Sequence, residues 1–333
     1  MIAEQLIQTS IDHASLSDDR APSQRTLGLY AGSVLALSNG ANTAVTHLAV
    51  ITEPDTYSPI QGDVLADLAE RGIHVDSLLQ KATVDLRPTY PCWVSENMPP
   101  SLSLPFGQLL VFEMPSPHVT ELPHACWKLF RALQAATRGQ PASLAVQVGG
   151  PGWNEADTLR LLRMLFFAAV RYGGVTEWEL QAVKLFIDPA YATSARAQFQ
   201  AWVTAYENPP VSVPLDTKVG PWSEDPERRK RALADINDDK NTRDIGLVPR
   251  VTERQLNVVV AWTGNAIYRA IRETLSDTNI DKPDFVYFQP TIVVLSTALA
   301  NLRDYICADD DPVFRGTHLL DKGLATYTKK VPT

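Results

Sequence analysis

Residues 143–157 read Ser-Leu-Ala-Val-Gln-Val-Gly-Gly-Pro-Gly-Trp-Asn-Glu-Ala-Asp, which places a strand, a glycine-rich turn and a helix start in direct succession. Glycines let main-chain N–H groups approach an anion closely, and the first turn of a helix adds a partial positive charge. Gly149, Gly150 and Gly152 are therefore candidate phosphate-binding residues. A plain tight turn is the alternative interpretation of the same loop. Trp153 is either a packing residue near the helix start or a stacking surface for a ligand.

Short apolar runs alternate with helical periods on both sides of this segment. Strands are predicted at 27–37, 45–52, 91–96, 109–114, 143–148 and 178–187, and helices at 63–71, 123–137, 155–172 and 192–206. Such alternation predicts a layered α/β domain whose sheet is at least partly parallel. In such sheets ligands bind beyond the carboxyl ends of the strands, so the loops that follow strands are where a site is expected.

The order of elements over residues 27–206 resembles a macrodomain, the family that binds ADP-ribose. Residues 143–157 are similar to that family's strand, diphosphate-binding loop and acidic helix start, and 178–187 to its next strand. The chain departs from the family at Gly32-Ser33-Val34, where an aspartate often follows the glycine, and at 52–57, where asparagines are usual. The resemblance implies a three-layer mixed sheet that binds ADP-ribose. A macro-like scaffold without a ligand is the alternative.

Residues 208–250 are rich in proline and in charged residues, and they predict a linker. This linker would separate a macro-like α/β domain at 1–207 from a second domain at 251–333. Thr252 and Gln255 have the spacing of a capping box at the start of the second domain. Residues 255–275 then predict one amphipathic helix whose apolar face includes Leu275.

Three stretches of the second domain resemble the opening of an ADP-ribosyltransferase of the R-S-E class, namely 260–272, 298–302 and 313–316. In that family an arginine on the first strand binds the NAD phosphate, and a planar guanidinium suits this task. The resemblance assigns this role to Arg315, beside Gly316, in a partial α+β domain. An ion pair of Arg315 with an aspartate of 309–311 is the alternative. The family's Ser-Thr-Ser strand and catalytic glutamate have no match in 319–333, so no catalytic residue is assigned.

Composition and charge exclude several other classes. A formal net charge of -8 argues against a nucleic-acid partner, because phosphate neutralisation needs a basic surface. No run approaches the roughly 20 apolar residues needed to cross a membrane. The N-terminal residues lack a basic start and a continuous apolar core. We therefore expect a cytoplasmic protein, or one delivered to a target cell without a cleavable signal.

Metal-dependent and thiol chemistry are not expected. The three cysteines, Cys92, Cys126 and Cys307, are far apart, and the six histidines lack ligand spacing. The sequence also has no P-loop, no G-x-S-x-G motif and no H-E-x-x-H motif.

Taken together, these patterns predict a NAD-dependent mono-ADP-ribosyltransferase toxin, effector or defence protein with a macro-like regulatory domain, whose catalytic glutamate segment is absent from this chain. NAD would be its substrate, or ADP-ribose its ligand, and a protein target or regulatory partner is expected. The alternative is a non-catalytic ADP-ribose-binding or protein-interaction module. The sequence does not indicate the oligomeric state.

Overall fold

The computed structural model describes residues 3–11, 25–37, 44–60, 63–114, 122–149, 153–175, 178–210, 252–263, 265–276 and 279–301. The chain divides into two compact units, Met1–Asn301 and Leu302–Thr333, of which the second falls outside these residues. Residues 211–250 of the predicted linker and the segment 313–316 also lie outside them. The predicted domain boundaries at 207 and 250 stay predictions.

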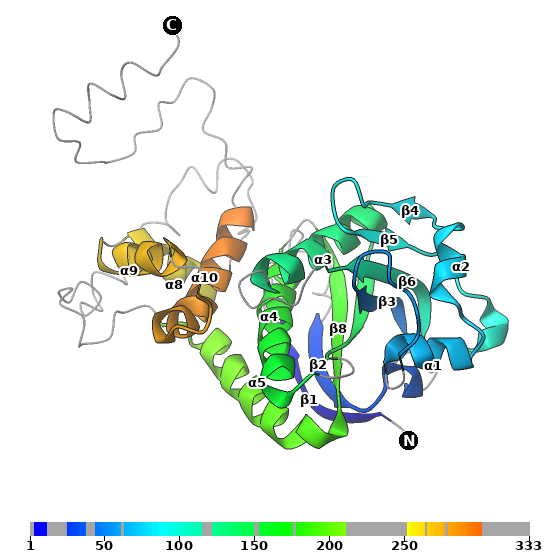
Figure 1. The fold of residues 1–333 in the computed structure, drawn as a ribbon. Helices are drawn as coiled ribbons and strands as arrows, with labels where there is room; N and C mark the ends of the chain where they lie inside the picture. The colour runs from blue at the N-terminus through cyan, green and yellow to red at the C-terminus, as the bar shows by residue number, and fades with distance from the viewer. Residues whose placement is uncertain are drawn as a thin grey trace, which may run out of the picture. The chain divides into compact units, whose positions relative to one another are not determined.

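The first unit is built on one mixed sheet of eight strands (Figure 1). In sheet order the strands are β1 (Glu4–Ser10), β2 (Thr26–Ala31), β8 (Leu180–Ile187), β7 (Ala142–Gln147), β3 (Val45–Thr52), β6 (Phe106–Glu113), β5 (Cys92–Val94) and β4 (Val84–Asp85). The strands from β2 to β6 in this order run parallel, whereas β1, β5 and β4 pair antiparallel at the two edges. The predicted α/β fold with a partly parallel sheet is confirmed.

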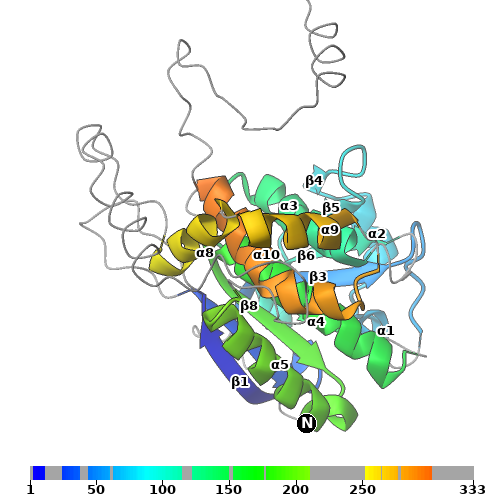
Figure 2. The same ribbon diagram turned by 90° about the vertical axis from the view of Figure 1, so that its left-hand side faces the viewer.

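Helices cover both faces of this sheet (Figures 1 and 2). The elements are α1 (Val64–Glu70), α2 (Val75–Leu79), α3 (Leu122–Thr137), α4 (Glu155–Gly173) and α5 (Ala192–Glu207), with short 3-10 turns η1 (Val34–Ala36), η2 (Pro100–Leu102) and η3 (Pro189–Tyr191). Successive strand residues alternate between two cores: Leu185 packs with α3, α4 and α5, and Phe186 packs with α1 and α2. This alternation follows from the two-residue period of a strand and gives three layers.

Two differences from the predicted strands have local causes. β2 ends at Ala31, not at residue 37, because Gly32 adopts φ +114 and Ser33 then caps η1. β1 was not predicted, since its residues are exposed or half-buried and its sequence lacks the apolar run of a central strand. Pairing with β2 forms it at the edge of the sheet.

Three further helices follow, α8 (Glu253–Thr263), α9 (Asn265–Ser276) and α10 (Pro283–Asn301). α10 packs on α4, and α9 packs against α8 and α10. The capping box is confirmed, because Thr252 and Gln255 exchange hydrogen bonds of 3.1 and 3.3 Å. The prediction of a single helix over 255–275 is wrong, since α8 ends at Thr263 and α9 begins at Asn265. Leu275 is 57% exposed rather than buried. None of the described helices is long and apolar enough to span a membrane.

Polar side chains from two distant segments close the C-terminal end of α4. Arg25 donates from Nη1 to the carbonyl oxygen of Gly173 at 2.5 Å, and Asn301 donates from Nδ2 to that of Gly174 at 3.1 Å. The last carbonyls of a helix have no partner inside it. These contacts therefore satisfy buried acceptors and attach α10 to the three-layer core.

We expect Asn301→Ala to lower the free energy of unfolding by about 1–3 kcal/mol, because it leaves a buried carbonyl without its donor. Urea unfolding followed by circular dichroism measures this. The control is Leu299→Ala on the same helix, which is 45% exposed and should cost less than about 1 kcal/mol. Equal losses for the two variants would contradict the assigned role of Asn301.

His47 is a buried histidine on β3, only 6% exposed. Burial lowers the pKa of His47 from 6.5 to about 4, since the charged ring would lose its hydration. A depressed pKa means that the unfolded chain binds a proton at higher pH than the folded one. The contribution of His47 to stability is therefore complete above pH 6.5, and it is lost as the pH falls towards 4.

His47→Gln should consequently flatten the fall in stability between pH 6.5 and 4, removing up to about 3 kcal/mol of pH dependence. Urea midpoints measured across this range for both proteins provide the check. An unchanged slope in the variant would show that other groups cause the acid sensitivity.

Candidate ligand-binding pocket

A cavity of about 740 Å³ lies beyond the carboxyl ends of β2, β7 and β8, with α1 as its opposite wall. Its lining comes from the turn after β2, the end of β7 and the loop after it, the turn after β8, both ends of α1 and the first turn of α4. The residues are Gly32, Ser33, Leu35, Ala36, Asp63, Val64, Asp67, Glu70, Arg71, Gln147, Val148, Gly149, Trp153, Thr158, Asp188, Pro189 and Tyr191.

The connections of the sheet diverge beside this cavity. β3 and β7 are neighbours, yet β3 leads through α1 and α2 towards β6, while β7 leads through α4 to β8 on the other side. In open α/β sheets, ligands bind at the carboxyl ends of strands where the order reverses in this way. The cavity thus occupies the place that sheet topology favours for a ligand.

Hydrogen bonds hold η1 between β7 and α1. The Ser33 hydroxyl accepts from the N–H of Leu35 at 3.3 Å and donates to Oδ2 of Asp67 at 2.9 Å. The N–H of Val34 donates to Oε1 of Gln147 at 3.2 Å. At position 33, where the family pattern would place an aspartate, the chain therefore has a serine. Its hydroxyl is hydrogen-bonded to the carboxylate of Asp67 on α1.

Gly149 lines the cavity and has φ +89, a conformation that favours glycine. A Cβ built on Gly149 would lie 3.0 Å from Oγ1 of Thr158. The side chain of Asn154 then caps α4 by accepting from the N–H of Asp157 at 2.9 Å. A glycine is thus required at position 149 by the turn itself, whereas its role in phosphate binding stays a prediction.

The other predicted site residues, Gly150, Gly152, Arg315 and Gly316, lie outside the described residues. Sequence reasoning did not identify Gln147, Asp67 or Arg71. Gln147 carried a usable signal, because it is a polar residue inside the apolar run 144–148. Asp67 and Arg71 carried none, since charged residues on a short helix are ordinary surface residues.

The charge of the cavity wall is predominantly negative. Four carboxylates line it, those of Asp63, Asp67, Glu70 and Asp188, and Arg71 is its one cationic residue within the described part of the chain. Asp63 and Asp188 also cap α1 and η3, accepting main-chain N–H groups at 2.6 and 2.8 Å. Such a wall accepts hydrogen bonds from the hydroxyl and amino groups of a ligand.

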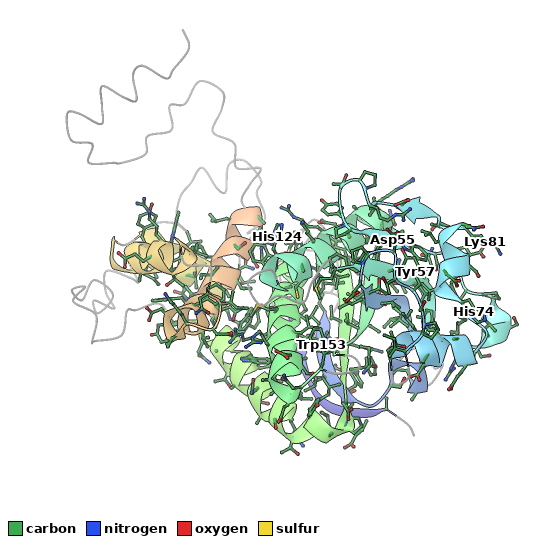
Figure 3. All side chains as sticks on the ribbon, in the orientation of Figure 1. Asp55, Tyr57, His74, Lys81, His124 and Trp153 are labelled. Atoms are coloured by element: carbon green, nitrogen blue, oxygen red, sulfur yellow. The ribbon has the colours of Figure 1, made fainter. Side chains whose placement is uncertain are left out.

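Two aromatic residues complete the wall. Trp153, which is labelled in Figure 3, is half-buried and packs partly against the main core. The hydroxyl of Tyr191 donates to the carbonyl oxygen of Trp153 at 3.4 Å. Trp153 therefore has the packing contact that one interpretation of the sequence predicted, and it also borders the cavity.

A second polar cluster lies at the ends of β3 and β6 and does not line this cavity. The Tyr57 hydroxyl donates to the buried carboxylate of Glu113 and accepts from Nε1 of Trp93 at 3.4 Å. Burial and the bond to Glu113 raise the pKa of Tyr57 to about 12. The cluster anchors the loop after β3, in which Asp55 and Tyr57 are labelled in Figure 3.

The residues that the structure describes form no site suited to metal binding or to thiol chemistry. These residues contain no group of three or more histidine, cysteine or acidic side chains placed to hold a metal ion. Cys92 and Cys126 are free and buried. Burial raises the pKa of the Cys92 thiol to about 12 and also raises that of Cys126, so neither is a reactive thiolate at neutral pH.

No protein family and no curated protein matches the chain. Macrodomains are among the solved structures that resemble the chain. The Oceanobacillus iheyensis macrodomain with MES bound is 12% identical, with a TM-score of 0.39, covering 60% of this chain and 98% of that one. The same macrodomain with ADP gives 12% identity, a TM-score of 0.38 and the same coverage.

The macro domain of ganglioside induced differentiation associated protein 2 is 12% identical, with a TM-score of 0.34, covering 56% of this chain and 90% of that one. At these scores the neighbours supply no argument about ligand or activity. The predicted ADP-ribosyltransferase domain receives no support from any of these comparisons.

We expect Gly149→Ala to destabilise the fold by about 2–3 kcal/mol, through its positive φ and through the contact with Thr158. Gly72→Ala is the matched control, because Gly72 has φ +77 and no heavy atom within 4 Å of a built Cβ. It should cost only about 1 kcal/mol. The extra destabilisation of Gly149→Ala over Gly72→Ala should be smaller in the double variant Gly149→Ala/Thr158→Ala. Urea unfolding of the wild type, the two single glycine variants and the double variant tests this. Equal costs at both glycines would contradict the tight packing of the turn.

Proposed function

We propose that this protein is a binding module for a nucleotide ligand of the ADP-ribose class, held in the cavity between α1 and the carboxyl ends of β2, β7 and β8. The observation that carries the proposal is the position of this cavity where the sheet connections diverge. Its volume of about 740 Å³ is within the range of about 300–1,000 Å³ usual for small-molecule sites.

The polar groups of the wall support this ligand class. Ribose hydroxyls and an adenine amino group are hydrogen-bond donors, and the wall offers acceptors from Asp67, Glu70 and the Ser33 hydroxyl. The strand, glycine turn and helix start around Gly149 resemble the diphosphate-binding segment of macrodomains. Among nucleotide ligands of suitable size, this resemblance favours ADP-ribose.

Transferase activity is not part of the proposal. Its predicted NAD-binding residues, Arg315 and Gly316, lie outside the described residues, and the comparisons do not support it. The protein target or regulatory partner expected from the sequence is kept as a further proposal: an ADP-ribose-binding module would recognise a partner through its ADP-ribose group.

Calorimetric titration with ADP-ribose tests the proposed ligand. Ala36 lines the cavity on η1, and Ala36→Trp should fill the site and lower the affinity by at least about tenfold without removing a charge or a cap. The matched control is Ala201→Trp on α5, which adds the same side chain at an exposed position outside the cavity and should bind like the wild type.

ADP-ribose should also raise the unfolding midpoint of the wild type and of the control, because a ligand that binds only the folded state stabilises it. Absence of binding at millimolar ADP-ribose would contradict the proposal and favour a protein-interaction scaffold. Binding that is unaffected by Ala36→Trp would place the ligand elsewhere. NAD titrated in parallel shows whether the module takes the intact dinucleotide.

A further inference from the structure

Two carboxylates occupy the first turn of α4, the helix that begins beside the cavity. Asn154 caps this helix, Glu155 is its first residue and Asp157 its third. A helix N-terminus is equivalent to about half a positive charge, and an unpaired carboxylate in the first turn offsets that charge. The proposed function relies on this helix start, together with the Gly149 turn, to bind a diphosphate. The charge of the two carboxylates therefore bears on the affinity for the ligand.

Arg160, one turn further along α4, pairs with Asp157. Nη1 of Arg160 lies 2.8 Å from Oδ1 of Asp157. The other oxygen, Oδ2, accepts from Nδ2 of Asn154 at 2.7 Å, and the main-chain N–H of Asp157 donates to Oδ1 of Asn154 at 2.9 Å. Both carboxylate oxygens of Asp157 are thus occupied, one by a cation and the other by the residue that caps the helix.

Asp281, from the segment before α10, holds Arg160 in this position. Nε of Arg160 lies 3.1 Å from Oδ2 of Asp281, and Nη2 of Arg163 lies 2.9 Å from Oδ1 of the same carboxylate. Arg163 also donates to the carbonyl oxygen of Ile280 at 2.9 Å. Arg163 therefore makes the same attachment between α4 and this segment, whereas Arg160 also reaches Asp157.

Glu155 lies on a different side of the helix start. It lines a groove between α4 and α5, together with Arg160, Arg163 and Asp281, and it does not line the cavity. Its side chain is exposed, so water and salt screen its charge. Asp157, in contrast, is half-buried and bonded to the cap residue that follows Trp153 of the cavity wall. Asp157 is therefore the carboxylate that would most oppose an anion at the Gly149 turn.

We propose that Arg160 is a positioning residue of the ligand cavity. By compensating the charge of Asp157, it allows the Gly149 turn and the start of α4 to hold the diphosphate of the ligand. Arg160 does not line the cavity, so it acts through Asp157 and not by contact with the ligand. This inference rests on the proposed function, because it concerns the affinity of the same cavity for an ADP-ribose-class ligand.

Calorimetric titration of the full chain with ADP-ribose at low ionic strength, where charges are least screened, tests the inference. Arg160→Gln should lower the affinity by about threefold to tenfold, because it leaves the charge of Asp157 uncompensated near a bound anion. Adding Asp157→Asn to this variant removes that charge and keeps an acceptor for Asn154. The affinity of the double variant should return to within about twofold of the wild type.

The matched control is Arg163→Gln, which removes the same charge from the same helix and the same Asp281 pair. Arg163 has no bond to Asp157 among its contacts in the described residues. Arg163→Gln should therefore bind ADP-ribose like the wild type. A loss equal to that of Arg160→Gln would overturn the inference, because the attachment of the segment before α10 would then be the cause.

The remaining outcomes separate the two proposals. Wild-type protein that binds no ADP-ribose overturns both the proposed function and this inference. Wild-type binding with equal affinity in Arg160→Gln overturns the inference alone, and so does a double variant that stays as weak as Arg160→Gln. If Arg160→Gln fails to fold in a thermal scan, Asp157→Asn in the otherwise unchanged chain decides. A higher affinity for ADP-ribose than that of the wild type then supports the inference, and an unchanged or lower affinity overturns it.

Discussion

The pairing of β7 with a parallel neighbour on each side is the constraint on which the rest of the structure depends. β7 bonds to β3 and to β8, so its backbone polar groups are satisfied within the sheet and both of its faces must be covered by apolar side chains. Thr46 and Ser143 extend this pairing, since their hydroxyl and main-chain groups exchange hydrogen bonds of 2.7–2.9 Å. Helices on both faces are a consequence.

Burial of α4 follows from that arrangement. The helix lies on the sheet with one face, and α10 covers part of another face, so most of α4 is buried. A helix buried in this way must have its terminal carbonyls satisfied by protein groups, because water does not reach them. Arg25 and Asn301 come from opposite ends of the described chain to do so. The helices after residue 251 are therefore part of the same hydrophobic structure as the sheet.

The acidic character of the cavity has a structural origin as well as a chemical consequence. Helix starts gather at the carboxyl ends of the strands, and aspartates are good caps for them. Asp63 and Asp188 perform that task and border the cavity at the same time. A cavity formed in this way accepts hydrogen bonds readily. Among its described lining residues Arg71 is the one cation, and its Nη2 donates to the Leu35 carbonyl oxygen on η1.

The strands and helices with strong apolar periods could be predicted from sequence. The predicted strand 45–52 coincides with β3, and the predicted helix 155–172 ends one residue before α4 does. Features that depend on contacts between residues far apart in the sequence could not be predicted from it. β1 exists because the edge of β2 is free to pair, and the Ser33–Asp67 bond joins residues 34 positions apart.

What the sequence by itself determined is therefore local: the alternation of strands and helices, the glycine at position 149 and the capping box at Thr252, each of which depends on the period or conformation of a few consecutive residues. The tertiary structure alone decided which charges share the cavity and that Arg71 lies against η1 rather than against its own helix. The physical reason is that the position of a charged side chain depends on partners supplied by other segments, and no local pattern of residues encodes those partners.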